Sequence, residues 1–115
     1  MINICFMDDG KRIGLTMQGH AGTAPFGEDL VCAAVTMMAY TAAQEAQNLC
    51  AAGKLEAMPS ITLNSGDAVI SMIPRQEHLE EARICMRVIR AGCDVLAANY
   101  GKAVRIFNVG NGESR

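Results

Sequence analysis

The most constraining feature of this sequence is an uninterrupted helix-forming run over residues 30–52, which contains neither glycine nor proline. The stretch before it holds Gly22, Pro25 and Gly27, which prevent a regular element there. Asp29 is well placed to cap the helix by accepting from N–H groups of the first turn, so Leu30 becomes the first helical residue. Gly53 suits the left-handed backbone that commonly ends a helix. The sequence therefore predicts a long helix over residues 30–52.

Small side chains dominate this predicted helix and should let another element approach it closely. Its alanines are Ala33, Ala34, Ala39, Ala42, Ala43, Ala46, Ala51 and Ala52. Alanine also has the highest helix propensity, so the run is helical on intrinsic grounds. Close packing on a sheet is the favoured interpretation, and a helix–helix contact across a dimer is the alternative.

A β-hairpin is expected before this helix and a second group of elements after it. Apolar residues alternate over 2–7 and again from Ile13 to Met17, with Asp9-Gly10 in the turn between them. The return strand ends at Gly19-His20. The later elements are a strand over 61–63, a strand over 68–73, a helix opening at 77 and closed by Gly101, and a strand over 103–109. The nearly continuous apolar run of 68–73 is expected to place that strand centrally.

The element order is therefore ββαββαβ in a single domain over residues 1–115, with a polar tail after residue 109 that is expected to fray. Such an order predicts an α+β fold. We expect a five-stranded mixed sheet with two helices packed on it as an α/β/α sandwich. The order of the strands within the sheet does not follow from the pattern.

Composition narrows the classes of function. A net charge of −2 and a pI near 5.6 argue against nucleic-acid binding driven by bulk charge. No apolar run approaches the roughly 20 residues of a membrane span. Five cysteines without a C-x-x-C pair, and no recognisable export signal, predict free thiols in a reducing cytoplasm. Neither histidine has a second ligand at the short spacing of zinc sites, so we expect neither a metal nor a cofactor.

Cys32 would be the third residue of the predicted helix, where chemistry favours a reactive thiol. The positive end of the helix dipole and the first-turn N–H groups stabilise a thiolate, and the same donors could hold an oxyanion. His20 is joined to this turn by a loop that can span roughly 3.3 Å per residue, so its imidazole can reach the thiol as a base. The Asp29 charge opposes thiolate formation, so its capping role must dominate. The alternative is a capped helix with a buried, inert cysteine and a surface histidine.

The residues around this pair resemble the ribosomal-processing cysteine protease (Prp) family. The resemblance rests on Gly19-His20-Ala21, then a short glycine-containing loop, then Gly27-Glu28-Asp29-Leu30-Val31-Cys32-Ala33-Ala34-Val35-Thr36. One position departs from the family pattern, because Thr36 stands where the family usually has serine. The hydroxyl is kept, and the extra methyl group changes its packing.

The resemblance implies a cytoplasmic, homodimeric cysteine endopeptidase. Such a protein would remove the N-terminal extension of a large-subunit ribosomal protein by cleaving next to phenylalanine, without metal or cofactor. It implies that Cys32 is the nucleophile and that His20 is the base and then the acid. We find no convincing residue in the sequence to orient the imidazole, so we predict a dyad. The implied supporting or substrate-binding residues are Gly19, Gly22, Phe26, Gly27, Asp29 and Thr36. Asp29 would position the helix, and the loop 21–27 would move to admit the peptide.

Two other functions remain open at this point. One is a non-catalytic ribosome- or peptide-binding module of the same fold. The other is a small-anion binder, although the Gly22-x4-Gly27 spacing lacks the Lys-Ser/Thr pair of a P-loop. Eight methionines are expected mainly as core filler, with a peptide-accommodating groove as the alternative. We interpret His78 as a surface residue, and Arg83, Arg87 and Arg90 as a solvated face rather than a docking surface.

Overall fold

The structure is a computed structural model that describes residues 1–20 and 29–109. Its elements follow the predicted order ββαββαβ, with one short 3-10 turn added before the second helix. They are β1 (Ile2–Asp8), β2 (Ile13–Gly19), α1 (Leu30–Ala51), β3 (Ser60–Asn64), β4 (Asp67–Met72), η1 (Gln76–His78), α2 (Leu79–Asn99) and β5 (Val104–Val109). The polar tail beyond residue 109 lies outside the described residues.

The five strands form one mixed sheet in the order β3-β4-β2-β1-β5. β1 pairs parallel to β5, and the other neighbours pair antiparallel. The five-stranded mixed sheet is confirmed. β4 lies inside the sheet as its apolar run predicted, although β2 occupies the middle position.

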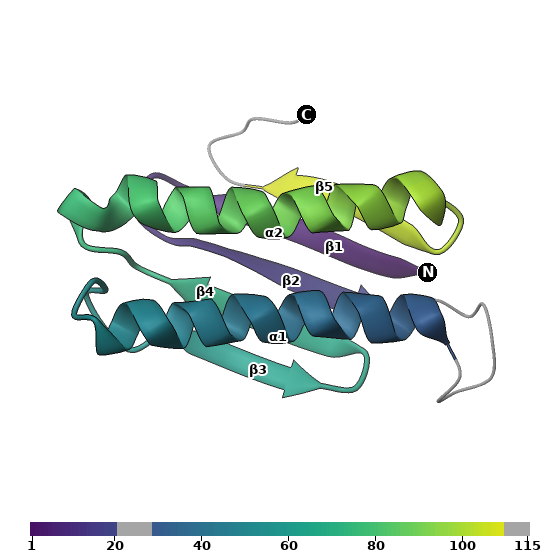
Figure 1. Ribbon diagram of the computed structural model, residues 1–115, viewed down its shortest axis with the longest axis horizontal. Coiled ribbons are helices and arrows are strands. Elements are labelled where there is room, and N and C mark those ends of the chain that lie inside the picture. Colours follow the sequence, from purple (N-terminus) through teal and green to yellow (C-terminus); the bar gives the residue numbers. More distant parts are fainter. Residues whose placement is uncertain (21–28, 110–115) are drawn as a thin grey trace.

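Both helices cover the same face of the sheet (Figure 1), so the architecture has two layers where an α/β/α sandwich would have three. Chain connectivity explains the difference. α1 carries the chain from β2 past β4 to β3, and α2 carries it from β4 past β2 and β1 to β5. The two crossovers start from β2 and β4, which run antiparallel to each other, and they lead to opposite edges of the sheet. Right-handed crossovers, which are the rule, then place both helices on one side.

The hydrophobic core lies between the sheet and the helix pair. Ile4, Leu15 and Ile70 from three adjacent strands have no exposed surface. The alternate residues on the strands face the uncovered side of the sheet and are more exposed, as in Asn3 and Gln18. This one-sided burial is the pattern of an antiparallel sheet with one solvated face.

The alanines of α1 let the helix pack closely, as expected. Ala39, Ala42, Ala43 and Ala46 are all at most 5% exposed. α1 contacts β4, β3 and also α2, so the small residues serve packing within this chain. Neither helix of the described chain holds an apolar stretch that could cross a bilayer.

Candidate active site

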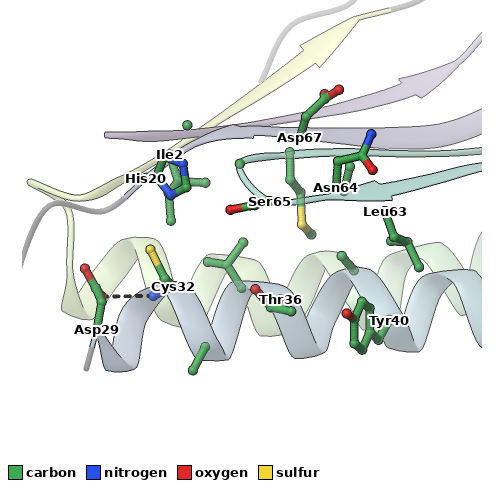
Figure 2. A pocket seen from close by; sticks show the side chains of 17 residues that line it. Ile2, His20, Asp29, Cys32, Thr36, Tyr40, Leu63, Asn64, Ser65 and Asp67 are labelled. Atoms are coloured by element: carbon green, nitrogen blue, oxygen red, sulfur yellow. Dashed lines mark hydrogen bonds between the residues drawn. The ribbon is translucent and has the colours of Figure 1, made fainter. Parts of the chain in front are cut away.

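A cleft of about 670 Å³ opens between the first half of α1 and the turn that joins β3 to β4. It brings together residues from the end of β2, from α1 and from the β3–β4 turn (Figure 2). His20 and Cys32 both line it, although they lie twelve residues apart in the sequence, His20 just after the end of β2 and Cys32 in α1. Of the cysteines in the described chain, Cys32 is the one that lines this cleft.

Asp29 caps α1 as the sequence predicted. Its backbone is extended, with φ −82° and ψ 104°, and its carboxylate accepts a hydrogen bond from the Cys32 N–H at 3.0 Å. The Asp29 side chain is buried, with the residue only 8% exposed. Because this hydrogen bond occupies the backbone N–H of Cys32, an oxyanion in the cleft needs another hydrogen-bond donor.

Cys32 lies in the first turn of α1 and is partly buried. Its sulfur points away from the helix, on the side where His20 lies (Figure 2). The side chain is therefore accessible from the cleft and close to the N-terminal end of the helix dipole, where negative charge is stabilised.

His20 follows the last residue of β2 and is anchored through its backbone. The carbonyl of His20 accepts from the Met1 nitrogen at 2.5 Å, and the N–H of Gly19 donates to the carbonyl of Gly66 at 2.9 Å. Gly19 has φ +104°, and a Cβ there would lie 2.2 Å from the Met1 oxygen, so a larger residue does not fit. The absence of a side chain at Gly19 thus allows the chain to turn from β2 toward the cleft.

Thr36 and Tyr40 follow Cys32 along α1 at intervals of one helical turn, and both line the cleft. Opposite them are Leu63, Asn64 and Ser65 from the end of β3 and its turn (Figure 2). The cleft therefore continues away from Cys32 along the helix, as an extended peptide would require.

Sequence reasoning missed Tyr40 and the β3–β4 turn as parts of this site. The spacing 32, 36 and 40 could have indicated Tyr40, since residues four apart share one face of a helix. The sequence pattern does not connect the segment between the predicted strands 61–63 and 68–73 with His20, because it does not give the strand order that places this segment beside the histidine. Gly22, Phe26 and Gly27, predicted as supporting or substrate-binding residues, lie outside the described residues.

The second histidine lies elsewhere, as expected. His78 is half-buried before α2, where its Nδ1 lies 3.1 Å from the Glu81 carboxylate. Glu81 also pairs with Lys54 at 2.5 Å, and these two hydrogen bonds hold the pKa of Glu81 below its usual value. Arg83, from the predicted solvated face, pairs with Glu80 at 3.3 Å and also with Asp8 through two hydrogen bonds of 2.8 and 3.0 Å.

Two other cysteines are poorly suited to nucleophilic chemistry. Burial raises the pKa of the Cys93 thiol to about 12, and Cys93 has no exposed surface. Burial, together with a hydrogen bond to Glu45, also raises the pKa of Cys85. Since the thiolate is the nucleophile, both thiols are expected to be inert at neutral pH.

Solved structures with the same fold include proteases. A crystal structure of the essential ribosomal processing protease Prp from S. aureus, with a covalently linked product peptide, is 18% identical, with a TM-score of 0.72 over 95% of this chain and 100% of that one. The same protease with a substrate peptide gives a TM-score of 0.67 at 16% identity, over 95% of this chain and 100% of that one. The protein SMU.848 from Streptococcus mutans gives 0.69 at 19% identity, over 96% of each chain.

No curated protein matches this sequence significantly. The profile of the family described as cysteine protease Prp, in contrast, matches residues 1–105, which include every described residue of the cleft. That match spans nearly the whole chain and agrees with the fold. This protein therefore belongs to the cysteine protease Prp family.

Proposed function

We propose that this chain is an endopeptidase that removes the N-terminal extension of a large-subunit ribosomal protein, cleaving next to phenylalanine. Cys32 is the nucleophile and His20 the general base. The observation that carries the proposal is that the two side chains line one cleft, with Cys32 in the first turn of a capped helix. Family membership and the S. aureus protease solved with its substrate peptide support the substrate class.

The proposed reaction proceeds through a thioester. His20 takes the proton of the Cys32 thiol, and the thiolate attacks the scissile carbonyl to give a tetrahedral oxyanion. The oxyanion collapses, the C–N bond breaks, and His20 returns the proton to the leaving amine. A water molecule, deprotonated by His20, then attacks the thioester; the C–S bond breaks, the second product leaves as a carboxylic acid, and the proton on His20 restores the Cys32 thiol. Asp29 positions the first turn, and Thr36 supplies a hydroxyl one turn further along the cleft.

The walls of the cleft suit an aromatic substrate side chain. Tyr40 and Leu63 line it from opposite elements and are 52% and 39% exposed, so apolar surface is available for contact. Burial of such surface stabilises binding by about 25 cal/mol per Å². This supports an aromatic side chain in the substrate.

We also propose that the protein acts as a homodimer in the cytoplasm. The proposed ribosomal substrate supports the location. The outer face of α2 supports the dimer, because it exposes large apolar side chains, which mark interaction surfaces when they cluster. They are Ile84, Val88 and Val95, at 49%, 66% and 61% exposed.

Alkylation of each cysteine as a function of pH, measured by mass spectrometry, tests the proposed pair. Near pH 6–7 we expect Cys32 to react faster than the other cysteines. Its reaction should slow when His20 is changed to alanine. Cys93 serves as an internal control, because it should react only when the protein unfolds. If Cys32 reacts no faster than the other thiols and independently of His20, the nucleophile–base assignment is wrong.

Cleavage of a peptide that contains the extension and its phenylalanine completes the test. Cys32→Ala should abolish cleavage while the fold is retained, and Cys5→Ala and Cys50→Ala should cleave normally. Peptide binding without any cleavage by the unaltered protein would favour the alternative, a non-catalytic peptide-binding module.

A further inference from the structure

We propose that Gly66, in the β3–β4 turn, is a positioning residue for the His20 imidazole: the missing side chain creates the seat against which the ring packs. This inference rests on the proposed role of His20 as base. It gives the turn between β3 and β4 a role in positioning the dyad, which the sequence pattern did not indicate.

The geometry at Gly66 carries the inference. A Cβ added there would lie 2.6 Å from Nε2 of His20, 3.0 Å from Cε1 and 3.3 Å from Cδ2. Real Cβ atoms essentially never come closer than 3.0 Å to another heavy atom, so any side chain at this position must push the ring away. The imidazole is the far end of a side chain and can swing aside, so its position would change before the backbone does.

The backbone of Gly66 is tied to the same histidine. Its carbonyl accepts from the N–H of Gly19, the residue directly before His20, at 2.9 Å. This bond extends the β2–β4 ladder by one step beyond the pair Gln18 and Asp67. Gly66 therefore fixes the strand end that carries His20 and also limits where the ring can lie, and both are needed to keep a base in reach of Cys32.

Glycine is favoured at position 66 for a second reason, its backbone conformation, and the experiment must separate this effect from the contact with His20. Gly66 has φ +71°, a left-handed conformation that strains most other residues. Gly10 provides the matched control, because it has φ +87° in the β1–β2 turn and no atom lies within 4 Å of an added Cβ. Alanine at either position meets the backbone strain, but only at Gly66 does it meet the imidazole. Asparagine tolerates this backbone conformation and still carries a Cβ, so it gives a less strained second variant.

The experiment compares Gly66→Ala and Gly66→Asn with Gly10→Ala and Gly10→Asn. Readouts are Tm, kcat and KM for the phenylalanine peptide, the pH profile of Cys32 alkylation, and NMR titration of the two histidine rings. We expect both alanine variants to lower Tm similarly. Only the Gly66 variants should lose kcat by tenfold or more, give an alkylation profile like that of His20→Ala, and shift the His20 resonances while those of His78 stay in place.

Folded Gly66→Asn protein with kcat, alkylation profile and His20 resonances like the unaltered protein would overturn the inference. The NMR readout does not depend on catalysis, so it separates two failures. A His20 ring displaced in the Gly66 variants, in a protein whose Cys32 reactivity never depended on His20, would confirm the seat and refute the proposed dyad. An unmoved ring in a protein with a working dyad would refute the seat alone.

Discussion

At the scale of single residues, Asp29 connects the stability of the fold with the geometry of the site. Its carboxylate binds the N–H of Cys32 itself, so the group that caps α1 also fixes the backbone of the proposed nucleophile. The charge of the same carboxylate opposes formation of a nearby thiolate. The two effects make different predictions for substitutions at this position.

Replacing Asp29 with alanine should lower the free energy of unfolding by about 1 kcal/mol, the usual effect of losing an N-cap. It should also lower kcat, because the first turn that carries Cys32 loses its anchor. Asp29→Asn keeps a capping oxygen without the charge and should retain both stability and activity. Urea unfolding and peptide cleavage on the three proteins measure this. An asparagine variant as impaired as the alanine variant would show that the charge, and not the cap, matters.

At the scale of elements, local signals located the parts of the site but not their arrangement. The Asp29 cap, the start of α1 at Leu30 and the positive φ of Gly53 follow from nearest neighbours in the chain, and each is confirmed. The position of the β3–β4 turn beside His20 depends on strand order and crossover direction. Those properties arise from contacts between distant segments, so no local pattern contains them. Without the strand order and the crossover directions, the sequence also allowed an α/β/α sandwich with three layers.

The residues of α1 that line the cleft also indicate where we expect substrate specificity to be determined. Tyr40 lies two helical turns from Cys32 and lines the cleft, whereas Met37 lies on the same helix, is 61% exposed and does not line it. Tyr40→Ala should raise KM for the phenylalanine peptide roughly fivefold to tenfold, consistent with loss of about 1 to 1.4 kcal/mol of binding, with a smaller effect on kcat.

Met37→Ala is the matched control for Tyr40→Ala and should leave both constants unchanged. Steady-state kinetics with peptides that carry phenylalanine or alanine next to the cleavage site measure the preference. A Tyr40→Ala enzyme with unaltered discrimination between the two peptides would place the aromatic subsite elsewhere.

At the scale of the whole molecule, the site and the main ion pairs occupy opposite ends. The cleft lies where α1 begins and β2 ends, whereas α1 ends and α2 begins at the other end (Figure 1). There Lys54 after α1 pairs with Glu81 of α2, and Arg83 of α2 pairs with Asp8 at the end of β1. These pairs connect both helices and the hairpin at a distance from the proposed chemistry. We therefore expect that losing charge pairing at that end leaves the cleft unaltered.

The pH dependence of stability at Asp8 tests whether the ion pairs and the cleft are independent of each other. The hydrogen bonds from Arg83 hold its pKa below the usual 3.8, so the folded state favours the charged carboxylate. A lowered pKa in the folded state means that its stabilising contribution is present above pH 3.8 and is lost as the pH falls through the lower, folded value. Asp8 is 41% exposed, so solvent screening limits this contribution to about 0.5–1 kcal/mol.

Asp8→Asn should therefore be less stable than the unaltered protein at pH 7 by about that amount. The difference should shrink as the pH falls below 3.8, because the carboxyl becomes protonated first in the unfolded state and then, at lower pH, in the folded state. Urea unfolding at a series of pH values measures it. The kcat for the phenylalanine peptide at pH 7 should not change, because the pair lies at the end of the molecule opposite the cleft. A stability difference that is constant from pH 7 to pH 2 would mean that packing, and not charge pairing, makes Asp8 stabilising. A fall in kcat would mean that the two ends are coupled through the helices.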